Sequence, residues 1–218
     1  SYNQNSVYGN TYVETIDGIP YGEVATFVGK KANSYMPVFS KMEITGAKTS
    51  WHWPTALLSF CFGPIFTALW FFYRKMYKIA FIFVALGVIT AATSALIIGP
   101  TLQEVDLFDI VLNLDEEALL NNTELMNSTL LLEIANLISG SIGLACAIIC
   151  GLFTHGWYKK HIHNSILKYR ASNVDMSYYH IGLMSIGGTS GGMLALGFVI
   201  MLFAENISTL IYTIQALI

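Results

Sequence analysis

The sequence predicts an all-α integral membrane protein: three spanning helices, a re-entrant or interfacial hairpin broken by Gly-Pro, and a small helical N-terminal cap. The first observation is composition, because 54% of the 218 residues are hydrophobic and only 11% are charged, against about 25% charged in soluble domains. The second is four stretches without Asp, Glu, Lys or Arg, at 51–73, 79–98, 134–153 and 181–204. Each could cross a hydrocarbon core of about 30 Å as a helix. Such a chain is neither a disordered tail, a basic nucleic-acid binder nor an ordinary soluble globule.

The first fifty residues divide into two parts. Residues 1–20 are polar and predict a linker. Residues 21–50 predict a helical cap, because apolar residues recur at spacings of three and four from Gly22 to Ile44, the pattern of two short amphipathic helices divided near Ala32–Asn33. The cap either folds onto the membrane domain or provides a docking surface. Its apolar positions are Val24, Phe27, Val28, Tyr35, Val38, Phe39 and Met42.

The uncharged segment 51–73 is interrupted near its middle by Gly63-Pro64. Proline lacks a backbone donor and disfavours helix at the residue before it. A hairpin that enters the membrane and returns explains this break. It also keeps the four lysines of residues 1–50 in the cytoplasm. The same segment as a full span remains the alternative.

The remaining predicted segments are a membrane helix at 79–99, an exterior acidic loop at 100–130, a membrane helix with a basic cytoplasmic extension at 131–171, and a Gly-rich membrane helix at 181–204. An apolar C-terminal segment, 205–218, is expected at the outer interface. The loop has seven acids and no Lys or Arg. Basic loops stay cytoplasmic, so the N-terminus is predicted to lie in the cytoplasm. The basic extension has an apolar stripe, through which we expect it to lie on anionic lipid headgroups. The residues expected near headgroups are Arg74, Lys75, Lys78, Lys159, Lys160, Lys168 and Arg170.

Small residues follow two helix faces. Such faces let helices approach closely in lipid, so they pack within one chain or form the seam of an oligomer. One set recurs every four positions, and the other forms two overlapping GxxxG pairs. The interaction residues are Ser139, Gly143, Ala147 and Gly151, then Gly187, Gly188, Gly191 and Gly192.

The three spanning stretches contain no ionisable acid or base that could move protons or charge. This argues against a proton-coupled transporter, a pump or an intramembrane metalloprotease. His155, His161 and His163 are candidate metal ligands by residue type. However, positions two apart diverge on a helix, and no Cys or acid lies close enough in sequence to complete a set. We therefore predict no catalytic residue, cofactor or metal. The three cysteines lie in apolar runs without a CxxC pair and are expected to pack.

The segment from Trp51 to Pro64, WHWPTALLSFCFGP, and the segment from Trp70 to Tyr77, WFFYRKMY, resemble a known pattern. It is the signature W-x-W-A-A-F-F-F-G-P-x-W-x-x-Y-R-K-M-Y of an uncharacterised family of small bacterial membrane proteins with a domain of unknown function. The resemblance extends over about residues 17–190 and implies a bacterial cytoplasmic membrane with a cytoplasmic N-terminus, but no reaction. Members often carry an N-terminal zinc ribbon, for which this sequence has no CxxC pair. The family's alanine pair is replaced here by Pro54-Thr55-Ala56.

These observations lead to three functional hypotheses. The first is a non-enzymatic membrane subunit or scaffold that engages protein partners, or a second copy, through the Gly-rich faces and the exterior loop. The second is a component of a small-molecule or lipid pathway with a pocket at Gly63-Pro64. The third is an enzyme that uses the cytoplasmic histidines. Membrane lipids are expected partners, and nucleic acid is not.

Overall fold

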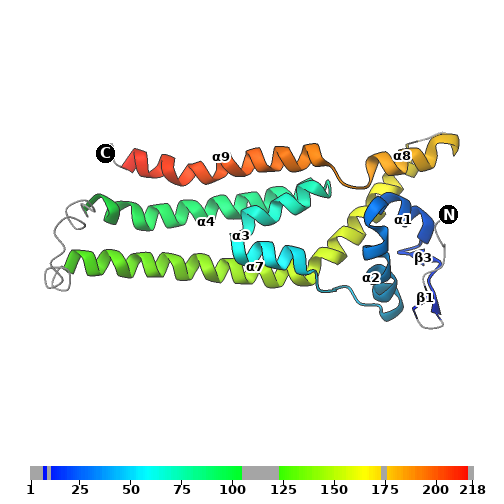
Figure 1. Cartoon of the computed structure of the whole chain (residues 1–218), viewed down its shortest axis with the longest axis horizontal. Coiled ribbons are helices and arrows are strands. Elements are labelled where there is room, and N and C mark those ends of the chain that lie inside the picture. Colours follow the sequence, from blue (N-terminus) through cyan, green and yellow to red (C-terminus); the bar gives the residue numbers. More distant parts are fainter. Residues whose placement is uncertain (1–6, 9–10, 105–122, 173–175, 216–218) are drawn as a thin grey trace.

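The computed structural model describes residues 7–8, 11–104, 123–172 and 176–215. Three long helices lie side by side: α4 (Tyr77–Glu104), α7 (Thr123–Arg170) and α9 (Gly191–Gln215) (Figure 1). A folded cap covers one end of this bundle, and the C-terminus lies at the other end. Four helical regions are long and apolar enough to cross a membrane. The predicted all-α membrane fold is confirmed.

The cap begins with two short antiparallel hairpins rather than with an extended linker. The strands are β1 (Val7–Tyr8) paired with β2 (Thr11–Tyr12), and β3 (Thr15–Ile16) paired with β4 (Ile19–Pro20). Asp17 and Gly18 have positive φ values of 49° and 77°, as the tightest hairpin turns require. Ile16 and Ile19 are buried in the core. The linker predicted for residues 1–20 is therefore wrong over this second hairpin, because a short Asp-Gly turn lets two isoleucines face the cap helices.

Two short helices complete the cap, as predicted. α1 (Tyr21–Val28) and α2 (Ala32–Thr45) are separated by a 3₁₀ turn, Gly29–Lys31. Their apolar faces pack in one core with the end of α7, and Phe27 and Phe39 are almost completely buried there.

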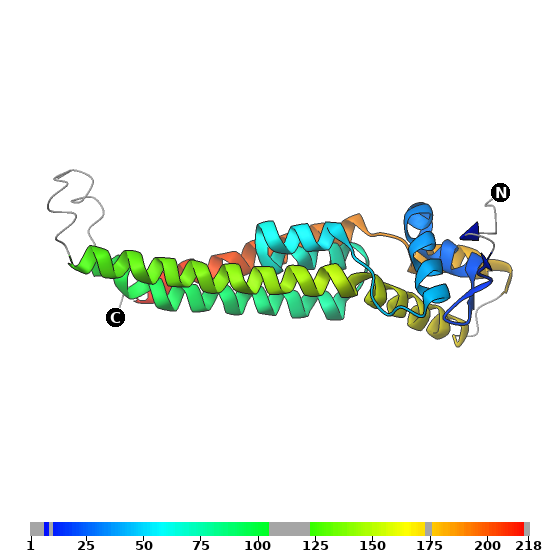
Figure 2. The same ribbon diagram turned by 90° about the horizontal axis from the view of Figure 1, so that it is seen from below.

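The extension of α7 does not lie on lipid headgroups through its apolar stripe. Tyr158, Ile162 and Ile166 are each at most 1% exposed, because the cap packs over them. Figure 2 shows α7 continuing from the bundle into the cap, so that one helix connects both parts of the molecule. The stripe is apolar, as predicted, but it packs against protein rather than lipid.

α3 (Trp53–Tyr73) is a hairpin rather than a span. Gly63 leaves helical geometry, with φ 80° and ψ −178°. The rings of His52 and Trp70 are 4.8 Å apart, whereas eighteen residues of straight helix would separate them by about 27 Å. Both ends of α3 therefore lie at the cap end of the bundle (Figure 1). The predicted hairpin, broken at Gly63, is confirmed, although the length and composition of α3 alone would allow a span.

The last part of the chain differs from the prediction. A 3₁₀ turn, Met176–Tyr178, precedes α8 (Tyr179–Ile186), and the chain leaves helical geometry before α9 begins at Gly191. The helix predicted at 181–204 is thus broken, and residues 187–190 form no GxxxG face. α9 instead continues through much of the separate segment predicted at 205–218. Most of the predicted 100–130 loop falls outside the described residues.

Candidate functional site

A buried polar and aromatic cluster joins the cap, the hairpin and α7. We call it the junction cluster. Its members come from three parts of the chain far apart in sequence. They are Tyr35 from α2, His52, Thr55, Trp70 and Arg74 from α3 and its flanks, and Thr154, His155 and Tyr158 from α7.

Arg74 occupies the cap side of this cluster and is only 3% exposed. Its guanidinium carbon lies 4.6 Å from the ring centre of Tyr35 and 5.0 Å from that of Tyr158. Nη1 donates a hydrogen bond of 3.1 Å to the Tyr158 hydroxyl. Among the described residues no carboxylate pairs with Arg74, and its Nε has no hydrogen-bond partner. Aromatic faces, which attract cations, take the place of a counter-ion.

His52 caps the first half of α3. The Thr55 N–H donates to its Nδ1 at 3.3 Å, so the imidazole satisfies a free N–H of the first turn. The Thr55 hydroxyl lies 2.9 Å from the same nitrogen and 3.0 Å from the Thr154 hydroxyl on α7. The backbone N–H of His52 also donates to the Gly151 carbonyl at 2.7 Å. These contacts hold the start of the hairpin against α7.

Burial, together with smaller contributions from the neighbouring His155 and Arg74, lowers the pKa of His52 to about 3. The folded protein therefore keeps this imidazole neutral, while the unfolded chain binds a proton near pH 6.5. Unfolding takes up a proton below that pH, so stability is full above about pH 6.5 and falls as the pH drops toward 3.

We expect the wild type to lose about 2 kcal/mol of stability between neutral pH and pH 5 through this group. His52→Asn keeps a capping side chain but removes the titration, so its stability should fall less over the same interval. Thermal unfolding in detergent at pH 7.5 and pH 5 measures the difference. Equal losses in both proteins would contradict a neutral buried His52.

The predicted packing residues of α7 are used within the chain. The hydroxyls of Ser139 and Ser94 on α4 are 3.1 Å apart. A Cβ at Gly143 would lie 3.5 Å from the Ser59 carbonyl oxygen, and one at Gly151 would overlap the Trp51 ring. Ala147 is also buried on this face. The hairpin fills the small-residue face, so it is not free for a partner.

The second glycine set has two different roles. Gly188 has φ 67°, and its N–H donates to the Phe27 carbonyl of α1 at 2.6 Å. A Cβ at Gly187 would overlap that same carbonyl oxygen. In contrast, a Cβ on Gly191 or Gly192 would meet no atom within 4 Å. The first pair joins the cap to α9, and the second pair remains open.

Most of the predicted headgroup residues have protein partners. Arg74 is buried, and Lys75 donates to the carbonyl oxygens of residues 185–187 at the end of α8. Lys159 pairs with Asp17 at 2.9 Å and Glu43 at 2.8 Å, and Arg170 pairs with Glu23 at 2.8 Å. The prediction is wrong for Arg74, which is buried against Tyr35 and Tyr158, and for Lys159, which pairs with two acids of the cap. Lys78, Lys160 and Lys168 remain exposed.

The histidines do not converge on a metal. His155 lies beside His52, with ring centres 4.7 Å apart, while His161 packs against Phe27. The described residues contain no group of three His, Cys, Asp or Glu side chains placed to hold an ion.

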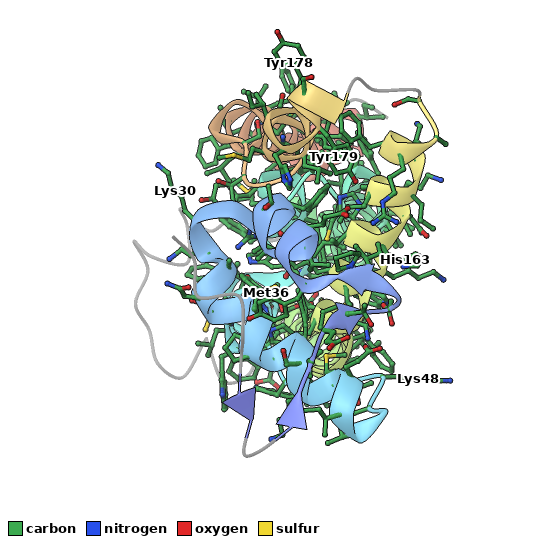
Figure 3. All side chains as sticks on the ribbon, turned by 90° about the vertical axis from the view of Figure 1, so that its right-hand side faces the viewer. Lys30, Met36, Lys48, His163, Tyr178 and Tyr179 are labelled. Atoms are coloured by element: carbon green, nitrogen blue, oxygen red, sulfur yellow. The ribbon has the colours of Figure 1, made fainter. Side chains whose placement is uncertain are left out.

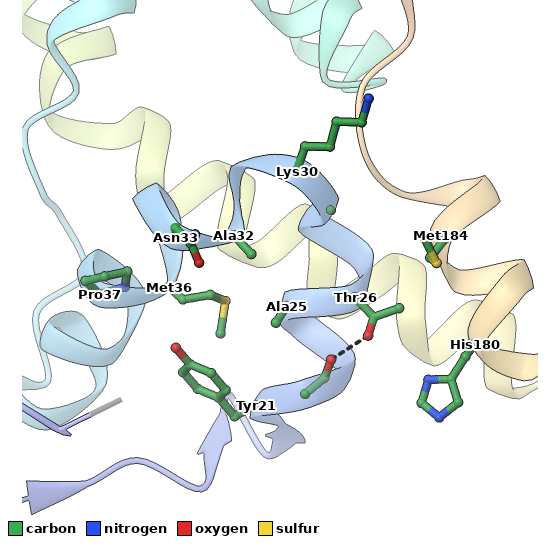
Figure 4. Close-up of a pocket in the computed structure, with 12 residues that line it drawn as sticks. Tyr21, Ala25, Thr26, Lys30, Ala32, Asn33, Met36, Pro37, His180 and Met184 are labelled. Carbon is green, nitrogen blue, oxygen red and sulfur yellow. Dashed lines mark hydrogen bonds between the residues drawn. The ribbon is translucent and has the colours of Figure 1, made fainter. Parts of the chain in front are cut away.

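A groove of about 770 Å³ lies on the outer surface of the cap (Figure 4). α1 forms its floor through Ala25 and Thr26, α2 forms one wall, and α8 forms the other through His180 and Met184. Among the described residues that line it, Lys30 is the only Lys, Arg, Asp or Glu. It and Lys48 extend away from the cap on different sides (Figure 3). Gly63 and Pro64 line neither this groove nor the two further cavities that the structure describes.

Sequence reasoning missed both the junction cluster and the groove. His52 and Thr55 lie within the quoted motif, but histidine is not one of the residues that usually mark the N-cap of a helix. Tyr35 and Arg74 carry no local signal, because their contact forms only when the cap folds back. No protein-family model matches the sequence, and no curated protein or solved structure is detectably similar to the chain.

Proposed function

We propose that this protein is a non-enzymatic membrane scaffold that holds a folded cap at the membrane surface and presents it to a partner protein. The observation that carries this proposal is the junction cluster, in which buried side chains join the cap rigidly to a hairpin inside the bundle. The cluster is closely packed around Arg74 and His52, and neither residue lines a described cavity. The arrangement therefore suits a mechanical connection better than a substrate site.

We propose that the cap lies on the cytoplasmic side of a bacterial cell membrane. Two basic segments, around Lys78 and Lys168, lie at the cap end of the bundle. The acidic residues 100–130 carry no Lys or Arg and come between α4 and α7 in the sequence. Short basic loops stay on the cytoplasmic side. The bacterial membrane is proposed from the resemblance of residues 17–190 to a family of small bacterial membrane proteins, which would place the N-terminus in the cytoplasm.

The cap groove is the surface proposed for the partner. Its floor and walls are largely apolar, and its single cation is Lys30. An amphipathic segment with an apolar face and an acidic residue near Lys30 would complement it. The small-residue face of α7 is already filled by the chain itself. We therefore propose that the partner contacts the cap and the open start of α9 instead.

A blocked groove should abolish the complex. Ala25→Trp places a large ring on the groove floor, and we expect the heteromeric band on blue-native gels of native membranes to disappear. Asn164→Trp is the matched control, because Asn164 is exposed on α7 and lines none of the cavities. A wild type that migrates only as a monomer, or a band that survives Ala25→Trp, would end this proposal.

A second candidate is a small-molecule or lipid pathway component. The volume of the groove, about 770 Å³, lies within the range of roughly 300–1,000 Å³ typical of small-molecule sites. This groove volume favours an apolar ligand bound in the cap rather than at Gly63-Pro64. A lipid retained through purification of the wild type and lost from Ala25→Trp would support this candidate over the scaffold.

A further inference from the structure

A second cavity, distinct from the cap groove, lies where the turn between α3 and α4 meets the extension of α7. Its volume is about 510 Å³. The turn contributes Lys75 and Tyr77, and α7 contributes His161, Ser165, Lys168 and Tyr169. We call it the basic pocket. We propose that the basic pocket binds a phosphate-bearing anion, namely the headgroup of an acidic phospholipid.

The charges around the basic pocket favour an anion. Lys75 and Lys168 line it, and among the described residues no Asp or Glu does. The three acids that form ion pairs in the described part of the chain are taken by Lys159 and Arg170. The charge of Lys168 is therefore left without an ion-pair partner among these residues, at an exposed position.

Lys75 is held in place before any ligand arrives. Its backbone has φ 60°, a conformation that costs energy for a residue with a side chain. Its ammonium donates to the carbonyl oxygens of Ser185 and Gly187, both at 2.8 Å. These bonds occupy its hydrogens but leave its charge in the wall of the pocket. Lys75 therefore attracts the anion by its charge alone, whereas Lys168 and the Ser165 hydroxyl donate hydrogen bonds to it.

The position of the basic pocket indicates a lipid rather than a soluble phosphate. Tyr77 begins α4, one of the helices long enough to span the membrane. The positive end of that helix dipole faces the same region. Tyr77 is 38% exposed, and tyrosines with one wet and one apolar side are typical of the membrane interface. Basic pockets between helices on the cytoplasmic side are suited to anionic headgroups.

The test compares two lysines on the same helix. Lys168→Gln removes a charge from the basic pocket, and Lys160→Gln removes the same charge from an exposed position that lines no described cavity. Each purified protein is titrated with phosphatidylglycerol, and binding is followed by native mass spectrometry. We expect Lys168→Gln to weaken phosphatidylglycerol binding about fivefold, while Lys160→Gln binds like the wild type.

Two further arms decide the outcome. Phosphatidylcholine with the same acyl chains should bind the wild type and both variants equally weakly. Glycerol 3-phosphate should bind far more weakly than phosphatidylglycerol if the source is lipid, whereas comparable binding of the two would assign the site to a soluble phosphate. Equal losses in the two lysine variants, or equal binding of the two phospholipids, would overturn the proposal. The result does not depend on whether the cap engages a protein.

Discussion

Replacing Gly187 by alanine is expected to separate the cap from the start of α9. The added Cβ would overlap the Phe27 carbonyl oxygen and lie 2.9 Å from the Leu183 carbonyl oxygen. Both obstacles are backbone atoms, so no side-chain rotation can relieve them. Overpacking of this kind costs about 1–3 kcal/mol, and loss of the neighbouring hydrogen bond from Gly188 to Phe27 adds about 1 kcal/mol. We expect a loss of about 2–4 kcal/mol.

Gly191→Ala is the matched control for this prediction. It lies four residues further on and belonged to the same predicted GxxxG set, but its added Cβ would meet nothing within 4 Å. Its stability should stay within about 0.5 kcal/mol of the wild type, as for most surface changes. Thermal unfolding in detergent, together with hydrogen exchange of α1, measures both. Similar effects of the two substitutions would mean that the glycines act through helix propensity rather than through cap contact.

Replacing Arg74 by alanine is expected to loosen the cap through the junction cluster. The change removes a cation stacked against Tyr35 and Tyr158 and leaves the Tyr158 hydroxyl without its donor. A desolvated cation–aromatic contact contributes about 2 kcal/mol, and an unmade hydrogen bond adds about 1 kcal/mol. Relief of the buried charge offsets part of this, so we expect a net loss of about 2–3 kcal/mol.

Arg74→Met separates packing from charge. Methionine fills much of the same space without a charge, so it should lose less stability than Arg74→Ala but still fall below the wild type. Lys78→Ala, at an exposed basic position nearby, should be close to neutral. Trypsin cleavage within the cap, at Lys30, Lys31 and Lys41, reports the loosening directly. If Arg74→Met were as stable as the wild type, the aromatic–cation contacts would contribute nothing to cap docking.

The two sets of small residues have the same spacing but different structures. Small residues at spacings of four lie on one face of α7, because a helix repeats its face at about that period, and Gly143 and Gly151 of this set lie close to the hairpin. The same spacing at 187–192 predicted a helical face that does not exist. The backbone must turn there to reach Phe27, and a contact with a segment 160 residues away leaves no local trace.

The sequence by itself determined the membrane helices, the break at Gly63-Pro64, the two cap helices and the common end of the basic segments. These features follow from local composition, because hydrocarbon excludes charge and unpaired backbone over any long stretch. Only the tertiary structure decided that the stripe on α7 is covered by the cap, that Arg74 is buried between two tyrosines, and that Lys75 and Lys168 share a pocket. These outcomes depend on whether an apolar surface packs against protein or against lipid. Contacts between residues distant in sequence decide this, so no local pattern predicts it.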